Sequence, residues 1–503
     1  MFEMMLEGLR GLMTISSLGF MAVGTLVGVI FGCIPGLTGG IAIALCLPYT
    51  FYLDVLPAMS LLIGIYAGSE FGGSIPAILV GTPGTPQASI TILDGYPMAK
   101  NGQSGKALKT ALYSSVCGNF FASFFTIFML VGLSSLALMM GPAELFSVTV
   151  FSIILIATIG SKGAWIKGLL AAFVGLLFSF VGSDPITGIP RFVFSYNMLG
   201  GIELIPVLMG LFVGSGILTS VNIPSKKLEF QKYKTSDKRF TKEEIKSCIP
   251  LILSGSLIGA VIGALPGLNA AVSSTLNYTF AKRISKHPER FGTGIVEGVC
   301  APECANNATA GPTLAPLLTL GIPGSGTAAI FMGALLIKGI QVGPTIFRDH
   351  GDVVYGIFFS IMICSLLLLL LGRFVINFAQ YIVFIPAEIL NPVIIFICIA
   401  GVYAGNSSLL DVFMFLIFLL IGYLMKLASI PVLPLLIAFL LGDTMEANFR
   451  RSLVISQGSL GIFFQSTISL IFLLITAIIL LYTILGPVIK KNIAKGKQKN
   501  GEG

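Results

Sequence analysis

The sequence predicts an all-α polytopic membrane protein with about twelve transmembrane spans, including two inverted-topology repeats that contain broken helices. Three observations lead to this fold class. Hydrophobic residues make up 55% of the 503 residues and charged residues only 10%, whereas a soluble domain carries about a quarter charged residues. Apolar stretches long enough to cross a bilayer, about 20 residues each, recur along the chain. A glycine- and proline-rich segment also occurs twice.

The apolar stretches are the predicted spans. Examples are residues 9–32, 146–160, 200–220, 354–372, 408–425 and 462–486. The 59 glycines and 25 prolines recur inside such stretches. Lipid tolerates interrupted helices only where the freed backbone packs in protein or lines a polar cavity. Broken helices are therefore expected at functional positions.

The internal repeat is read from two matching pairs of segments. GTLVGVIFGCIPGL at 24–37 aligns with GSLIGAVIGALPGL at 255–268, at an offset of 231 residues. GTPGTPQAS at 81–89 aligns with GIPGSGTAA at 321–329, at an offset of 240. Two copies of one unit are therefore expected, copy one near 20–110 and copy two near 250–348.

Charge predicts how the two copies are oriented. Copy one continues through PYTFYLDVLP (48–57), which has no basic residue, whereas copy two continues through FAKRISKHPER (280–290), which has four. Basic loops stay in the cytoplasm, so these equivalent points lie on opposite sides of the membrane and the repeats are inverted. The open alternatives are a duplication in parallel orientation and chance glycine matches. The expected organisation is an N-terminal half (1–222), a basic cytoplasmic connection (223–248), a C-terminal half (249–486) and a basic cytoplasmic tail (487–503).

The two Gly-Pro segments are the expected substrate site. Proline removes a backbone donor and glycine lets the chain turn freely, so a helix that restarts after such a break presents free N–H groups and its positive dipole end. That arrangement binds anions such as carboxylates. The expected substrate-binding residues are Thr38, Gly81, Thr82, Pro83, Gly84, Thr85, Asn269, Asn306, Asn307, Gly321, Pro323, Gly324, Ser325 and Thr327. Kinking for helix packing is the alternative reading of each break.

Acidic and amide side chains within apolar surroundings are further candidates, because burial there is costly. Glu303 stands beside Asn306 and Asn307 in APECANNATAGP (301–312), and Glu70 lies in the corresponding stretch of copy one. Glu70 and Glu303 are candidates for carrying a coupling proton or binding Na⁺. Structural hydrogen bonding between helices is the alternative role for the two asparagines and for Glu70.

Five other charged residues are expected to be structural or remain open. Asp94 resembles a turn-forming aspartate in a cytoplasmic loop, with a role in transport as the alternative. Asp184 and Arg191 suit either a fold-locking ion pair or a substrate contact. Glu446 and Arg450 stand four residues apart, a helical pairing distance, and are expected to be structural.

Composition also argues against several other functions. The eight cysteines are scattered and only two histidines are present, so we expect neither a metal centre nor a catalytic triad, and no cofactor apart from Na⁺ as a coupling ion. The basic runs adjoin predicted spans, so nucleic acid is not an expected partner. A passive channel and an intramembrane enzyme are weaker alternatives, and we expect no enzymatic activity.

Several long motifs carry a family resemblance. They are GTPGTPQASITILDGYPMAKNGQSGKAL (81–108), GSDPITGIPRFVF (182–194), APECANNATAGPTLAPLLTLGIPGSGTAAIFMGALLIKGIQVGPTIF (301–347) and LGDTMEANFRRSL (441–453). Together they resemble the large membrane subunit of the tripartite tricarboxylate transporter family, from about residue 15 to residue 485. The family's paired Gly-Pro motifs fall on Gly81–Thr85 and Gly321–Ser325, and its Pro-Glu-x-x-Asn-Asn motif falls on Pro302–Asn307.

The resemblance implies an ion-gradient-driven importer in a bacterial-type cytoplasmic membrane. It also implies a citrate-like di- or tricarboxylate substrate, a small membrane subunit and an extracytoplasmic solute-binding protein as partners. A stand-alone carrier of carboxylates or other organic anions is the alternative. Cys304 stands where alanine is expected and Gly326 where a larger residue is common. Both adjoin the expected site, so the substrate could differ from a tricarboxylate.

Overall fold

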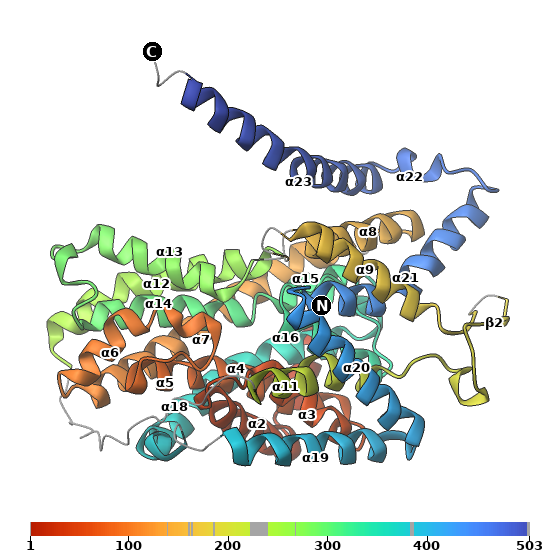
Figure 1. Ribbon diagram of the computed structural model, residues 1–503. Helices are drawn as coiled ribbons and strands as arrows, with labels where there is room; N and C mark the ends of the chain where they lie inside the picture. The colour runs from red at the N-terminus through yellow and green to blue at the C-terminus, as the bar shows by residue number, and fades with distance from the viewer. Residues whose placement is uncertain are drawn as a thin grey trace. The chain divides into compact units, whose positions relative to one another are not determined.

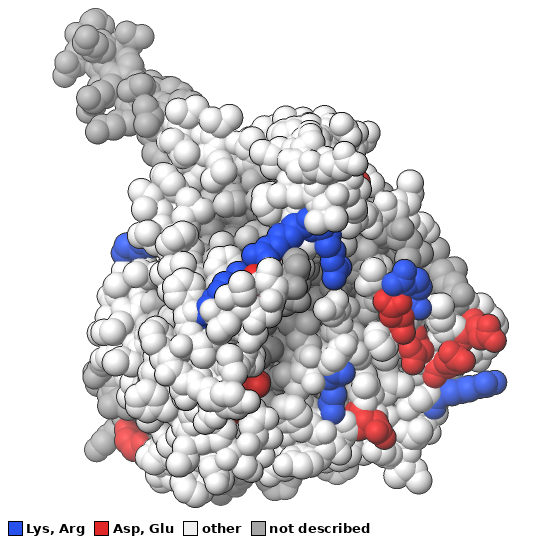
Figure 2. Space-filling model, turned by 90° about the vertical axis from the view of Figure 1, so that its right-hand side faces the viewer, with Lys and Arg blue, Asp and Glu red and all other residues white. Residues whose placement is uncertain are grey.

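The computed structural model describes residues 2–137, 139–158, 161, 164–184, 187–221, 240–266, 268–382 and 387–499. Most of the basic connection expected at 223–248, and Gly267 in the first break of copy two, lie outside these residues. The chain is an all-α polytopic membrane protein, as predicted. Its described strands form one two-stranded antiparallel pair, β1 (Gly182–Ser183) and β2 (Pro190–Arg191). On the face drawn in Figure 2, residues other than Lys, Arg, Asp and Glu cover most of the surface.

The described residues form two compact units, interleaved along the sequence (Figure 1). Unit 1 comprises Met1–Leu138 and Leu204–Tyr423, and unit 2 comprises Met139–Glu203 and Leu424–Gly503. The expected halves, 1–222 and 249–486, follow the repeat in the sequence. Packing instead joins both copies in unit 1, because each copy buries its helices against the other.

Unit 1 contains both copies of the repeat. Copy one and the helix after it comprise α2 (Ile15–Cys33), α3 (Gly39–Thr50), α4 (Val55–Gly72), α5 (Ser74–Val80), η1 (Pro86–Ser89), α6 (Ile92–Lys100) and α7 (Ser104–Ala137). Copy two and the helices after it comprise α12 (Lys242–Ala264), α13 (Ala270–Ile284), η4 (Pro288–Arg290), α14 (Val296–Ala310), α15 (Leu314–Leu320), α16 (Gly326–Ile337), α17 (Ile346–Asp349) and α18 (Gly351–Ile382).

Other elements complete the two units. Unit 1 also holds α1 (Phe2–Leu12), α10 (Leu204–Leu208), the π-helical η3 (Met209–Gly214), α11 (Ser215–Val221), α19 (Ala387–Asn406) and most of α20 (Leu409–Leu427). Unit 2 holds α8 (Pro142–Thr158), α9 (Trp165–Ser179), η2 (Tyr196–Met198), α21 (Val432–Ile455), α22 (Ile462–Gln465) and α23 (Thr467–Lys499), together with β1 and β2.

Nine helical segments in the described part of the chain are long and apolar enough to cross a membrane, fewer than the roughly twelve expected. They are Ile15–Cys33, Val55–Val80, Ser104–Leu130, Lys242–Ala264, Gly351–Phe378, Glu388–Asn406, Leu409–Leu427, Val432–Ile455 and Thr467–Leu485. Five shorter apolar helices accompany them, at Gly39–Thr50, Pro142–Thr158, Trp165–Ser179, Leu204–Thr219 and Gly326–Ile337. The difference arises partly because α3 and α16 are shortened by the breaks that precede them.

Glycines bring the first and third helices of each copy into backbone contact. A Cβ on Gly28 of α2 would meet the backbone of Ile65 in α4, and one on Gly259 of α12 would meet Ala305 in α14. Ala305 follows Ile65 by 240 residues, and Gly259 follows Gly28 by 231. The two offsets found in the sequence, 231 and 240 residues, therefore also relate the residues that pack together in the two copies.

The helices that follow the two copies show their relative direction. The offset of 240 residues superposes α7 on α18, and these helices pack together in unit 1. Gly372 of α18 lies against Leu112 of α7, whereas Ile361 of α18 and Ser123 of α7 both lie near Gly311. Sequence number rises along one helix as it falls along the other, so the equivalent helices run antiparallel. This is the relation expected of an inverted repeat.

Candidate functional site

The two Gly-Pro breaks have the same backbone geometry. Gly81 and Gly321 end α5 and α15 in the left-handed region, with φ of +67° and +71°. The next amide in each break, of Thr82 and of Ile322, donates to the carbonyl of a proline within the preceding helix, at 3.4 and 3.1 Å. Glycine is required at both positions because a side chain there would strain the left-handed backbone.

In the Gly-Pro break of copy one, backbone amides donate to carbonyls of the chain itself rather than to a ligand. The Gly84 N–H donates to the Gly73 carbonyl at 3.1 Å, and a Cβ on Gly84 would collide with the Gly32 carbonyl oxygen. Gly324 has more room, since a Cβ would lie 3.0 Å from the Thr313 methyl and 3.7 Å from the Gly263 carbonyl. Gly84 is therefore a packing glycine, and the expected approach of an anion to the Thr82 and Gly84 amides is not favoured.

Side-chain hydroxyls and helix N-termini lie together where the helices restart. Thr38 caps α3 through its hydroxyl, which accepts from the Ile41 amide, and Ser325 caps α16 by accepting from the Ala328 amide. These two helix starts come from different copies yet meet, because a Cβ on Gly40 would lie 3.5 Å from the Thr327 hydroxyl.

Tyr66 of α4 completes this meeting point, with its hydroxyl beside those of Ser325 and Thr313. We call the set Thr38, Tyr66, Ser325 and Thr327 the donor junction. Its members supply hydroxyls and adjoin the first-turn amides of two helices, which have no partner within an α-helix. Thr38, Ser325 and Thr327 are partly exposed. Two positive helix ends and several hydroxyls at one accessible place can bind a carboxylate.

The repeat-related meeting point has a different chemistry. Here η1 of copy one contacts α13 and α14 of copy two. Glu70 accepts from the Gln87 amide at 3.4 Å on its carboxylate and from the Asn306 amide at 3.5 Å on its backbone carbonyl. Thr85 lies against Gly73, one turn after Glu70. We call the set Glu70, Thr85, Gln87 and Asn306 the acceptor junction.

The second buried acid is satisfied by neighbouring side chains. Glu303 accepts from the hydroxyl of Thr91 on one carboxylate oxygen and from that of Ser115, at 3.4 Å, on the other. The Asn307 amide donates to the Ser115 hydroxyl at 2.8 Å and to the Glu303 backbone carbonyl at 3.2 Å. Glu303 and Asn307 thus connect α14 to α7 and to the residues that follow η1.

The other expected site residues are distributed around the breaks. Asn269 caps α13 through its own side chain and is exposed. Thr82 is exposed and Pro83 partly exposed, whereas Pro323 is buried. None of these three break residues belongs to either junction as defined above. Gln87 was missed by the sequence reasoning, although it directly follows the Thr85-Pro86 restart.

Asp94 is buried rather than placed in a surface turn. It belongs to α6 and accepts from the backbone amides of Gly292, Gly294 and Ile295 at 2.9 to 3.1 Å and from the Tyr278 hydroxyl at 2.8 Å. The turn expected from the sequence is wrong because these donors come from copy two, far along the chain. Asp94 holds the loop after α13 to copy one.

Lys338 makes a related contact from the end of α16. Its ammonium donates to the carbonyls of Phe51 and Leu53 at 3.3 and 2.5 Å, in the loop after α3. In each copy, a charged side chain that follows the Gly-Pro break therefore binds the backbone of the other copy: Asp94 in copy one and Lys338 in copy two.

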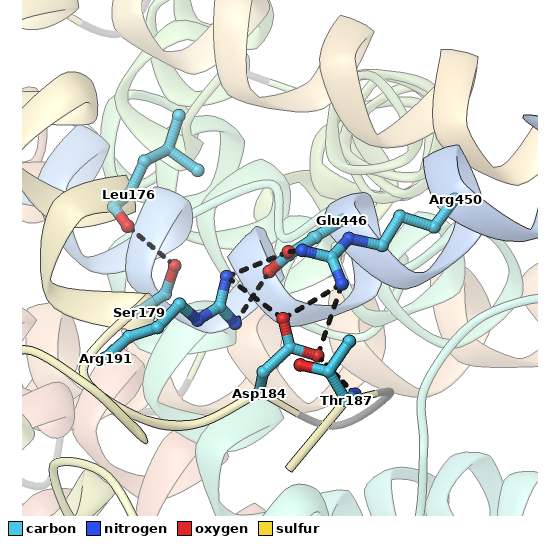
Figure 3. Close-up of polar contacts among 7 residues, drawn as sticks. All are labelled: Leu176, Ser179, Asp184, Thr187, Arg191, Glu446 and Arg450. Atoms are coloured by element: carbon cyan, nitrogen blue, oxygen red, sulfur yellow. Dashed lines mark hydrogen bonds and ion pairs between the residues drawn. The ribbon is translucent and has the colours of Figure 1, made fainter. Parts of the chain in front are cut away.

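The charged residues singled out in unit 2 form one closed network (Figure 3). Arg191 binds both carboxylate oxygens of Glu446, at 2.9 and 3.1 Å, and lies 3.7 Å from Asp184. Arg450 binds both oxygens of Asp184 and also pairs with Glu446. The ion pair expected within each local segment is thus shared between the β1–β2 loop and α21. The Glu446 interaction raises the pKa of Arg191 above its ordinary value.

Cys304, one of the two departures from the family pattern, is a packing residue. It is buried, and its backbone and sulfur lie against the Cβ position of Gly118 in α7. Gly326 is the first residue of α16, and the one described atom within 4 Å of its Cβ position is a ring carbon of Phe212, at 3.7 Å. The departure at Gly326 therefore leaves space beside the donor junction.

Antiparallel repeats, paired helix breaks and buried polar junctions define the class: this is a multi-pass membrane transport protein. The chain belongs to the tripartite tricarboxylate transporter TctA family, whose sequence model matches residues 18–437.

Two similar proteins come from Agrobacterium vitis. One, described as an uncharacterized 52.8 kDa protein in the TAR-I ttuC' 3' region, is 32% identical over 448 residues, which is 89% of each chain. The other, described as an uncharacterized protein in the TAR-II ttuC' 3' region, is 36% identical over 188 residues, 37% of this chain and 78% of that one. No solved structure matches.

Proposed function

We propose that the chain is the translocation subunit of a secondary transporter that imports a citrate-like di- or tricarboxylate. A gradient of Na⁺ or H⁺ drives uptake, an extracytoplasmic binding protein delivers the substrate, and a small membrane subunit completes the assembly. The chain resides in a bacterial-type cytoplasmic membrane, with the basic connection 223–248 and the C-terminus in the cytoplasm.

The donor junction is the observation that carries this proposal. A carboxylate needs hydrogen-bond donors and positive potential, and Ser325 and Thr327 offer both beside the start of α16. Thr38 and the start of α3 add a second helix end from the other copy. A substrate held between two copies can be released on either side when one copy moves against the other.

The coupling ion belongs near the two buried acids. Glu70 and Glu303 are 4% and 0% exposed and lie in helices from different copies. A carboxylate in a membrane interior is stable when it is protonated or paired with a cation. Either form lets the acid couple substrate movement to an ion gradient.

Uptake of labelled citrate into proteoliposomes tests the proposal. The chain is reconstituted with its small subunit and supplied with its binding protein, and a Na⁺ or proton gradient is imposed. We expect citrate to accumulate against its gradient and to leak away when an ionophore is added. Equilibration without accumulation would indicate a channel, and chemical conversion of citrate would indicate an enzyme; either result contradicts the proposal.

A further inference from the structure

The acceptor junction contains buried oxygen atoms that lack a hydrogen-bond donor. Among the described residues, these are one carboxylate oxygen of Glu70, the hydroxyl of Thr85, and the amide oxygens of Gln87 and Asn306. Glu70, Thr85 and Asn306 are at most 4% exposed. Leaving buried polar atoms unpaired is destabilising, so the absence of donors at several neighbouring oxygens calls for an explanation.

The amide orientations follow from the contacts of the nitrogen atoms. The nitrogens of Gln87 and Asn306 both donate to oxygens of Glu70, at 3.4 and 3.5 Å. Reversing either amide would place an oxygen against an oxygen. The two unpaired atoms are therefore oxygens, which bind a cation or accept a hydrogen bond but do not bind an anion.

Glu70 also lacks a cationic partner within the described residues, where no ion pair includes it. This contrasts with Glu303, whose two oxygens accept from Thr91 and Ser115. It contrasts equally with Asp184 of unit 2, which is bound by Arg450. The carboxylate of Glu70 is thus less compensated by neighbouring side chains than the carboxylates of Glu303 and Asp184.

We infer that Glu70, Thr85, Gln87 and Asn306 form a binding site for a monovalent cation of the sodium class. One carboxylate, one hydroxyl and two amide oxygens are ligands that a hard cation prefers. The single formal charge of the site balances one positive charge, whereas a divalent ion would leave excess charge buried. This inference rests on the proposed function in naming the coupling ion, and it assigns Asn306 and Thr85 to the cation instead of the carboxylate.

The assignment also separates the two acids. Glu70 becomes the charged ligand, and Glu303 becomes a positioning residue that holds α14 through Thr91 and Ser115. The cation site joins α4 and η1 of copy one to α14 of copy two. Binding of the ion would therefore stabilise the contact between copies.

Thermal unfolding of the purified full-length chain in detergent tests the inference without any transport. NaCl is titrated against choline chloride at constant ionic strength. A ligand that binds the folded state raises the unfolding temperature by mass action. We expect a saturable rise with Na⁺ and no rise with choline.

Three variants locate the site. Thr85→Val removes one ligand while keeping the side-chain shape, and we expect the half-saturating Na⁺ concentration to rise about 10- to 100-fold. Glu70→Gln should abolish the shift. Thr319→Val is the matched control, because the Thr319 hydroxyl is buried but bonds to the Ala315 carbonyl of its own helix.

Each outcome decides the inference. Absence of a Na⁺-dependent shift in the parent chain overturns it, and so does a shift that depends on pH but not on Na⁺, which would place a proton on Glu70. The assignment is overturned if the Na⁺-dependent shift is unchanged in both Thr85→Val and Glu70→Gln. It is also overturned if Glu303→Gln loses the shift while Glu70→Gln retains it. If Na⁺ binds as described but citrate is not accumulated, the cation site stands and the proposed function fails. If citrate is accumulated but Na⁺ does not bind, the proposed function stands and the cation site fails.

Discussion

The donor and acceptor junctions occupy equivalent places in the two copies but differ in chemistry. Tyr66 and Ser325 at the donor junction correspond to Asn306 and Thr85 at the acceptor junction, each pair separated by 240 residues. Glu70 has Ala310 as its equivalent, so only one junction has an acid there. The repeat supplies the same backbone twice, and side-chain differences set which charge each junction can bind.

The largest expected effect comes from a substitution that disrupts the packing of α2 on α4, the helix that carries Tyr66 and Glu70. A Cβ at Gly28 of α2 would strike the Ile65 backbone of α4, which cannot move aside easily. Gly28→Val should destabilise the fold by about 3 kcal/mol or more. Size-exclusion chromatography of the solubilised protein should show loss of the monodisperse peak. Gly19→Val, in the same helix and with no atom of the described residues within 4 Å of its Cβ position, is the control. Equal behaviour of the two variants would contradict the packing described.

A smaller effect is expected from loosening the contact between copies without touching either junction. Asp94→Asn replaces an acceptor that receives three backbone amides and the Tyr278 hydroxyl. Hydrogen bonds to a charged group contribute about 1.5 to 3 kcal/mol, so the unfolding temperature should fall clearly. Asp54→Asn is the control, since Asp54 begins α4 without a side-chain cap bond. A fall of the same size in Asp54→Asn would remove the special role of Asp94.

Substitutions in the donor junction should weaken substrate binding while sparing the cation. Thr327→Val and Ser325→Ala each remove one hydroxyl, and we expect about a tenfold loss of citrate affinity for each. Equilibrium binding of labelled citrate measures this loss, and the Na⁺-dependent thermal shift of the same variants should be retained. Thr275→Val on α13 removes an exposed hydroxyl bonded to its own helix. If all three variants bind citrate equally, the donor junction is not the substrate site.

The smallest effect is expected in unit 2, where the charges are already paired. Arg450→Met leaves Asp184 with Arg191 and the Thr187 amide, and Arg450 is partly exposed. We expect a loss of about 1 kcal/mol or less, with no change in citrate or Na⁺ affinity. The neighbouring Arg451→Met, at an exposed position, provides the comparison. A loss of citrate affinity in Arg450→Met alone would give the network a role in binding.

The sequence predicted the fold class, the two copies and their register, because glycine spacing reports backbone contacts directly. Gly28 and Gly259 illustrate this, since they are equivalent at the offset of 231 residues and their packing partners Ile65 and Ala305 are equivalent at the offset of 240. The direction of the copies also followed from the loop charges. The expected span count was higher than the nine long helices found among the described residues, partly because the breaks leave apolar helices such as α3 and α16 too short to cross a membrane.

The site could be predicted only in part. Ser325 and Thr327 were found because they follow a visible break, but the partners that they meet come from the other copy. Gln87 and the donors to Asp94 were missed for the same reason: their contacts join residues far apart in the chain. The sequence also does not show which buried acid receives hydrogen bonds from its neighbours. Glu303 accepts from Thr91 and Ser115, and no local sequence pattern places these residues beside it.

The most direct measurement of the central claim is the sidedness of two equivalent loops. Tyr52→Cys lies in the loop after α3 and Lys286→Cys in the loop after α13, and both positions are exposed. A membrane-impermeant maleimide is applied to intact cells and to permeabilised cells, with the unsubstituted chain as background. Antiparallel copies predict that Tyr52→Cys reacts in intact cells and Lys286→Cys only after permeabilisation. Reaction of both from the same side would contradict the account.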